Sequence, residues 1–280
     1  MYEVITNDGR TLAVEEWGVP DGTAVVYCHG TPMSRLARYP DDELFGTLGI
    51  RLITYDRPGY GKSTPQRGRR VADAAADIEA IASALSLNRF PVFGVSGGGG
   101  HALAAAAGLP DRVTAVGVMA CTAPRDAAGL DWTAGMMEDN QASSVAAANG
   151  REALADHLAK AESSDLMSLV PPAEQAVLQR PDIQRMLSTA FAEALRPGLD
   201  GWIDDERALY ALPWGFDPST IRVPVRLWHG ELDTLVPVSH SVWLAERIPD
   251  ALLVREPTAA HAGHFLATPD MLRWLVATEG

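Results

Sequence analysis

The sequence has little cysteine, little lysine and no long hydrophobic run, and each shortage excludes a class of protein. Only Cys28 and Cys121 are present, too few for a fold built on disulfides, and no Cys/His spacing is typical of a zinc site. No apolar run reaches the roughly 20 residues that span a bilayer. The first residues lack the basic and then apolar pattern of a signal peptide. We therefore expect a cytoplasmic protein with buried, free thiols and no metal.

Positive charge is also scarce. The 280 residues include 36 Asp and Glu against 23 Lys and Arg, a net charge of −13, and only Lys62 and Lys160 are lysines. Nucleic acids and anionic membranes bind surfaces of the opposite sign, so the charge argues against both as partners. The preference for arginine hints at a GC-rich bacterial genome. A hydrophobic fraction of 47% is that of a folded protein, and the length suits one large domain with an insertion.

Short apolar runs alternate with helical periodicity at both ends of the chain. The turn Asn7-Asp8-Gly9 predicts a hairpin between strands over 2–6 and 11–17. Continuous apolar runs, typical of strands buried on both faces, occupy residues 23–28, 50–55, 90–95, 112–120, 223–228 and 251–254. Helices are predicted over 71–87, 101–107, 239–247 and 269–278. This alternation predicts an α/β fold with a mostly parallel sheet flanked by helices.

The alternation is interrupted between Thr122 and Phe216. This segment shows no convincing strand, and it contains helix-like pieces with breaks at Asn149-Gly150, Pro171-Pro172, Pro181 and Pro197-Gly198. It has 15 acidic residues against 7 basic ones. We interpret residues 122–216 as a helical cap inserted into an α/β core of residues 1–121 and 217–280. Its large apolar side chains, with His29 of the core, are candidate pocket residues, although such side chains more often serve packing: Trp132, Met136, Trp202 and Trp214.

The most informative stretch is Gly94-Val95-Ser96-Gly97-Gly98. A predicted strand leads into it and a predicted helix leads out. This context distinguishes a nucleophile elbow from a glycine-rich turn that only lets a helix approach a strand. In such an elbow the serine hydroxyl stands above the sheet. Ser96 is therefore the candidate nucleophile.

A serine nucleophile needs an acid and a base, and both types of residue follow later strands. Asp233 lies a few residues after the strand over 223–228, and we favour it over Glu231 as the acid. Two histidines, His261 and His264, follow the strand over 251–254. We favour His264 because a glycine precedes it and an aromatic residue follows it. The resulting chain order of serine, acid and histidine is that of α/β hydrolases.

Two backbone N–H groups are candidates for the oxyanion hole. Gly97 follows the serine and begins a helix, whose N-terminus favours negative charge. Thr31 lies in the loop His29-Gly30-Thr31-Pro32, after the strand over 23–28. Pro32 biases Thr31 towards an extended backbone, which leaves its N–H available. His29 is expected to hold this loop rather than to react.

Together these motifs resemble those of capped serine hydrolases of the α/β-hydrolase superfamily, over essentially the whole chain. The resemblance also includes the turn from Asp56 to Ser63, which is structural in that superfamily. It implies a catalytic triad of Ser96, Asp233 and His264 that needs no cofactor. Serine at position 96, rather than aspartate, implies acyl transfer. The run Gly97 to Gly100 departs from the pattern, and it indicates either close packing or a wide floor beneath the substrate.

The expected activity is hydrolysis of a small to medium, largely apolar carboxylic ester or lactone through an acyl-enzyme. The same scaffold also performs carbon–carbon bond hydrolysis, amide hydrolysis, perhydrolysis and lyase reactions, and fold alone does not separate them. A less favoured alternative is a binding protein with an idle triad. The expected partner is a small-molecule substrate, and the sequence predicts no oligomeric state.

Overall fold

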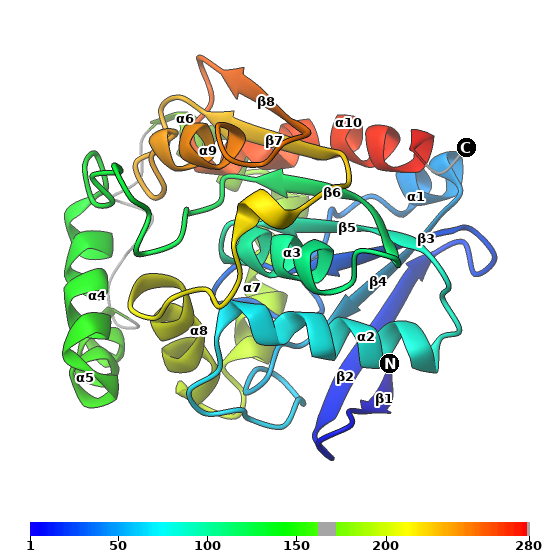
Figure 1. Cartoon of the computed structure of the whole chain (residues 1–280), viewed down its shortest axis with the longest axis horizontal. Helices are drawn as coiled ribbons and strands as arrows, with labels where there is room; N and C mark the ends of the chain where they lie inside the picture. Colours follow the sequence, from blue (N-terminus) through cyan, green and yellow to red (C-terminus); the bar gives the residue numbers. More distant parts are fainter. Residues whose placement is uncertain (162–171, 279–280) are drawn as a thin grey trace.

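The computed structural model describes residues 1–161 and 172–278 and contains an eight-stranded sheet with helices on both faces (Figure 1). The strand order is β1-β2-β4-β3-β5-β6-β7-β8. The first two strands pair antiparallel, as do β2 and β4, and every other neighbouring pair is parallel. The predicted α/β fold with a mostly parallel sheet is confirmed.

The strands lie close to their predicted positions. Their bounds are β1 Tyr2–Ile5, β2 Thr11–Gly18, β3 Thr23–Cys28, β4 Ile50–Tyr55, β5 Phe90–Val95, β6 Val113–Met119, β7 Val225–Gly230 and β8 Ala251–Glu256. Three of the eight, β3, β4 and β5, match the predicted bounds at both ends. Parallel strands buried on both faces leave continuous apolar runs, and these runs have sharp ends in the sequence.

Five helices cover the sheet. They are α1 Asp42–Leu48, α2 Ala74–Ala84, α3 Gly97–Gly108, α9 Ser239–Ala245 and α10 His264–Ala277. The sequence analysis missed α1, a short helix capped by the side chain of Asp41. It also began the last helix at Pro269, whereas α10 starts five residues earlier and contains that proline.

Two apolar cores lie on opposite faces of the sheet. The larger core packs α2, α3 and α9 against the strands, through residues such as Ile78, Leu103 and Leu244. The smaller core packs α1 and α10 through Phe45 and Leu272. Both cysteines are free and buried, as predicted.

The described residues between β6 and β7 form helices and no strand. These helices are α4 Glu138–Asn149, α5 Arg151–Ala161, α6 Pro172–Leu178, α7 Pro181–Ala194 and α8 Asp200–Tyr210. They lie together at one side of the sheet (Figure 1), and four of them share an apolar cluster that includes Leu154 and Trp202. Pro171, one of the predicted breaks, lies outside the described residues. The division of the chain into a core and a cap stays a prediction.

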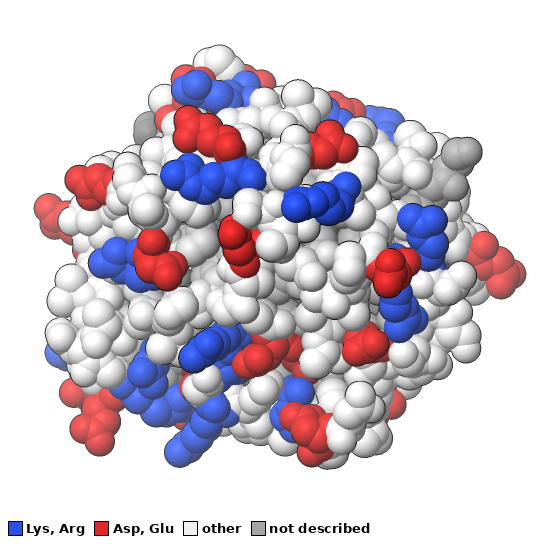
Figure 2. Space-filling model, in the orientation of Figure 1, with Lys and Arg blue, Asp and Glu red and all other residues white. Residues whose placement is uncertain are grey.

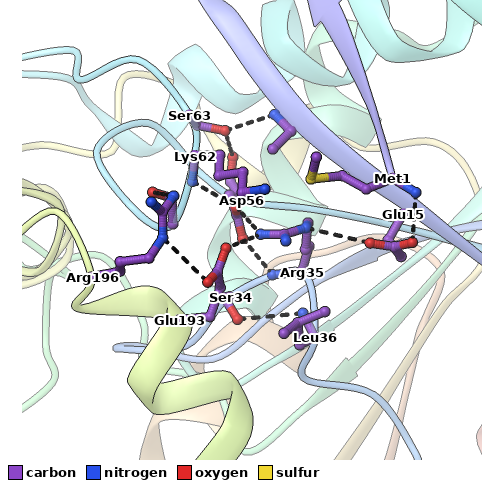
Figure 3. Close-up of polar contacts among 12 residues, drawn as sticks. Met1, Glu15, Ser34, Arg35, Leu36, Asp56, Lys62, Ser63, Glu193 and Arg196 are labelled. Carbon is purple, nitrogen blue, oxygen red and sulfur yellow. Dashed lines mark hydrogen bonds and ion pairs between the residues drawn. The ribbon is translucent and has the colours of Figure 1, made fainter.

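A buried ionic cluster links α7 to the loops that follow β3 and β4 (Figure 3). The carboxylate of Asp56 is fully buried and accepts hydrogen bonds from the backbone and side chain of Arg35, at 2.7 and 2.6 Å. The same guanidinium lies 2.7 Å from Glu193 of α7. The backbone N–H of Lys62 also donates to Asp56, at 3.0 Å. The turn from Asp56 to Ser63 therefore has the structural role expected for it.

Charges of both signs are interspersed on the face drawn in Figure 2. The acidic excess is thus not concentrated in one patch in this view. Within the described ranges, no helix is both long and apolar enough to cross a membrane.

Candidate active site

Ser96 occupies a strained turn between β5 and α3. Its φ of 54° and ψ of −129° lie in a region that residues with a side chain rarely adopt. The turn is held by hydrogen bonds from Ser96 N–H to the Met119 carbonyl, at 2.8 Å, and from Gly99 N–H to the Ser96 carbonyl, at 2.9 Å. Backbone strain of this kind persists where the surrounding structure enforces it, and it concentrates at functional sites.

The glycines around Ser96 are required by close backbone contacts. A Cβ atom on Gly94 would lie 2.3 Å from the Gly98 carbonyl oxygen, and one on Gly98 would lie 2.1 Å from the Cys28 carbonyl oxygen. A Cβ atom on Gly99 would lie 2.6 Å from the Cβ of Cys121. Of the two interpretations of the glycine run, the structure therefore supports close packing of α3 against its neighbours.

Asp233 lies in the loop after β7 and is fixed by several donors. Its Oδ1 accepts hydrogen bonds from the backbone N–H groups of Leu235 and Val236, at 2.9 and 2.8 Å. Its Oδ2 lies 2.7 Å from Nδ1 of His261 and 3.1 Å from Nε2 of His229. Burial opposes its ionisation, but the charge of His261 and the hydrogen bonds outweigh burial and lower the pKa of Asp233.

The structure pairs Asp233 with His261, whereas the sequence analysis expected His264 there. His261 begins the 3₁₀ turn His261–Gly263, and His264 already belongs to the first turn of α10. Nδ1 of His264 is buried and has no hydrogen-bond partner among the described residues. Burial, together with the charge of His261, lowers the pKa of His264 to about 3, so this imidazole is neutral. Burial also opposes charge on His261, but Asp233 outweighs it and raises the pKa of His261.

His229 is a site residue that the sequence analysis did not identify. It is fully buried on β7, and its Nδ1 lies 2.7 Å from the hydroxyl of Ser241. It contacts the same oxygen of Asp233, Oδ2, as His261 does. The signal in the sequence was a histidine four residues before the acid, at the end of a predicted strand.

The loop that carries Thr31 packs directly against the elbow. A Cβ atom on Gly97 would lie 2.3 Å from Oγ1 of Thr31, and one on Gly30 would lie 3.6 Å from Cβ of Ser96. The hydroxyl of Thr31 donates to Asp205 of α8. His29 holds the loop as expected, because its Nδ1 donates to the Gly30 carbonyl at 2.8 Å and its Nε2 accepts the Arg57 N–H at 3.3 Å. The predicted oxyanion residues thus lie beside Ser96.

A cavity of about 380 Å³ opens between the sheet and the helices that lie between β6 and β7, and Ser96, His261 and His264 all line it. Most of the other lining residues are apolar, from both sides; they include Phe45, Leu52, Phe93, Met137, Leu158, Leu187, Trp202 and Phe265. Of the five predicted pocket residues, only Trp202 lines the cavity. The other four, His29, Trp132, Met136 and Trp214, are buried elsewhere. Trp132, for example, donates to the Ala123 carbonyl, and Trp214 stacks on Phe216.

Helix α8 places two consecutive carboxyl groups beside the site. Asp205 is fully buried against two arginines, with Oδ2 at 2.5 Å from Arg57 and Oδ1 at 2.7 Å from Arg69. These charges outweigh burial and hold the pKa of Asp205 well below its usual value. Glu206 lines the cavity, and among the residues that the structure describes its donors are neutral: the hydroxyl of Ser143 and the indole of Trp202. Burial therefore raises the pKa of Glu206 to about 7.

Some known proteins match part of this chain in sequence, and others match most of it. A non-heme chloroperoxidase of Streptomyces lividans is 38% identical over 104 residues, 36% of this chain and 37% of that one. The chain thus matches about a third of the length of that relative. A pimeloyl-[acyl-carrier protein] methyl ester esterase of Aromatoleum aromaticum is 31% identical over 238 residues, 79% of this chain and 84% of that one.

The fold also matches solved structures along its whole length. An esterase from Exiguobacterium antarcticum superposes with a TM-score of 0.72 at 20% identity and covers 99% of both chains. The family model described as the alpha/beta hydrolase fold matches residues 23–268. This span runs from β3 into α10 and includes the elbow, Asp233 and both histidines. The chain therefore belongs to the α/β-hydrolase family.

Proposed function

We propose that the protein is a serine hydrolase that cleaves a small to medium, largely apolar carboxylic ester or lactone through an acyl-enzyme on Ser96. One observation carries the proposal. The strained Ser96 and the imidazole held by Asp233 line the same predominantly apolar cavity. A nucleophile, an oriented base and a place for an apolar substrate are thus provided together.

In the first half of the reaction, Nε2 of His261 accepts the hydroxyl proton while Oγ of Ser96 bonds to the substrate carbonyl carbon. Nδ1–H of His261 donates to Asp233, which stabilises the imidazolium. The N–H groups of Gly97 and Thr31 stabilise the oxyanion of the tetrahedral intermediate. When that intermediate collapses, the bond to the leaving oxygen breaks, and His261 returns the proton to the departing alcohol.

In the second half, water replaces the alcohol. His261 takes a proton from the water as its oxygen bonds to the acyl carbon, and the same N–H groups stabilise the second oxyanion. Collapse breaks the ester bond to Ser96, which recovers its proton from His261. The products are a carboxylic acid and an alcohol, or a hydroxy acid from a lactone. No cofactor takes part in this scheme.

The choice of esters and lactones is supported by the cavity and by the relatives. The apolar lining favours uncharged groups around the carbonyl. The near-full-length relative is named as a methyl ester esterase. The relative named as a chloroperoxidase supports perhydrolysis, the transfer of the acyl group to hydrogen peroxide instead of water, as a second candidate. Residence in the cytoplasm and a small-molecule substrate as the partner stay predictions.

The test is turnover of p-nitrophenyl esters of graded acyl length by the wild type and by Ser96→Ala. We expect kcat/KM to fall by at least about 10⁴-fold in the variant, since removal of a serine nucleophile has effects of this size or larger. The control is Ser188→Ala, an exposed serine of α7, which should keep full activity. Undiminished turnover by Ser96→Ala would overturn the proposal. Addition of hydrogen peroxide to the wild-type assay tests the second candidate through peracid formation.

A further inference from the structure

Glu174 is a cap residue that contacts the loop of the base. It lies on α6, is 2% exposed and lines the cavity. Its Oε2 accepts a hydrogen bond from the backbone N–H of Ala262, at 2.5 Å. Ala262 directly follows His261 in the 3₁₀ turn His261–Gly263. A carboxylate of the cap thus holds the backbone of the loop that carries the base.

An apolar contact also connects α6 with the loop that carries His261. Val177 of the same helix joins an apolar cluster with Ala262, in the middle of the turn, and Phe265, in the first turn of α10. The loop therefore has both a polar contact to its backbone and an apolar contact with α6. Asp233, in contrast, contacts the imidazole of His261 rather than the backbone of the turn.

The charges around His261 come from several elements. Asp233 follows β7, Glu174 lies on α6, and the ring of His264 on α10 is centred 6.1 Å away. His229 lies behind Asp233. Burial raises the pKa of Glu174, while the nearby imidazole of His261 and the N–H of Ala262 favour its charged form. In return, the Glu174 carboxylate contributes to the raised pKa of His261, after Asp233.

We propose that Glu174 is a positioning residue for the base, by which the cap fixes the place and the charge of His261. Asp233 orients the imidazole from the core, and Glu174 holds the backbone of the turn from the cap. The proposal rests on the proposed function, because it describes how the base of that reaction, His261, is positioned. It makes the cap part of the catalytic arrangement rather than only a cover for the substrate.

The test compares two substitutions at this position in the full-length protein, with kcat/KM for a p-nitrophenyl ester measured from pH 4.5 to 9. Glu174→Gln keeps an oxygen that can accept from Ala262 but removes the charge. It should move the acidic limb of the profile to lower pH, with little change on the plateau. Glu174→Leu removes both, and we expect kcat/KM on the plateau to fall by about 10- to 100-fold through misplacement of the base.

Thermal unfolding of each variant separates this effect from loss of the fold, and Glu152→Gln, at an exposed position of α5, is the matched control. An acidic limb that stays in place in Glu174→Gln, combined with a full plateau in Glu174→Leu, would overturn the positioning role. A wild type that is inactive, or as active as Ser96→Ala, would instead refute the proposed function. The two failures are therefore distinguishable.

Discussion

Two sides of the cavity are built differently: the sheet side, here the core side, and the side of the helices between β6 and β7, the predicted cap. On the core side, backbone geometry fixes the reacting groups: a strained turn holds Ser96, and two N–H groups fix Asp233. On the cap side, the polar groups are buried carboxyl side chains: Asp205 and Glu206 contact other side chains, and Glu174 accepts from the backbone of Ala262. In the function that we propose, the core residues carry the chemistry. The cap residues then set stability, the charge of the cavity and the position of the base loop.

Asp205 and Glu206 show how sharply the environment changes at this boundary. The two residues are consecutive on α8 and both are buried. Asp205 faces the arginines of the core, so it stays ionised, whereas Glu206 faces the cavity and neutral donors, so its pKa lies near neutrality. One helix thus presents a permanent charge to the core and a titratable group to the cavity.

The largest expected effect is the loss of kcat on substitution of His261, which distinguishes this histidine from His264. His261→Ala should lower kcat by about 10⁴-fold, since loss of a triad member leaves only binding and the oxyanion hole. His264→Ala should lower it less than about tenfold, because His264 does not contact Asp233. The measurement is kcat for a p-nitrophenyl ester, with thermal unfolding to verify the fold and His261→Gln as a second variant. The reverse order of effects would restore His264 as the base.

The next effect concerns the ionised carboxylate of α8. Asp205→Asn leaves the buried guanidinium groups of Arg57 and Arg69 without their counter-charge. We expect the free energy of unfolding to fall by about 3–5 kcal/mol, measured by urea denaturation. Asp200→Asn is a control on the same helix: its half-exposed ion pairs with Arg67 and Arg151 should contribute less than about 1 kcal/mol. Equal losses in both variants would show that burial does not distinguish these pairs.

The smallest effect is a pH dependence at Glu206. Because its pKa is raised from 4.5 to about 7 on folding, the folded state retains a proton that the unfolded state loses between these values. The contribution of Glu206 to stability is therefore full below pH 4.5 and falls as the pH rises through 7, by roughly 3 kcal/mol in total. The free energy of unfolding of Glu206→Gln, relative to that of the wild type, should therefore rise by most of these roughly 3 kcal/mol between pH 5 and pH 8.

The matched control is again Glu152→Gln, whose stability relative to the wild type should be constant over the same range. A constant difference for Glu206→Gln as well would mean that this carboxyl is not desolvated in the folded protein. The contrast between Asp205 and Glu206 would then be lost.

The core of the fold was predictable because its signals are local. Buried parallel strands leave apolar runs with sharp ends, and the elbow requires glycines at fixed spacing, as at Gly94 and Gly98. The serine and the order of the motifs follow directly. The position of Thr31 beside Ser96 followed from strand order, because loops at the carboxyl ends of neighbouring strands meet.

The base and the pocket depended on information that the sequence does not hold locally. His261 and His264 are three residues apart, and the choice between them depends on where α10 begins. Pro269 suggested a start at that residue because proline favours the first turn of a helix, but α10 starts at His264 and contains Pro269 as its sixth residue. The pocket residues depend on how the helices and loops between β6 and β7 pack on the sheet. Trp132 and Trp214 lie in loops and Trp202 lies on α8, and composition does not distinguish them.

The most direct test of the account is covalent labelling with a fluorophosphonate, followed by mass spectrometry of the peptides. We predict one adduct, on the peptide that contains Ser96, with a labelling rate that falls strongly in His261→Ala and little in His264→Ala. An unlabelled protein, or an adduct on any other residue, would contradict the account.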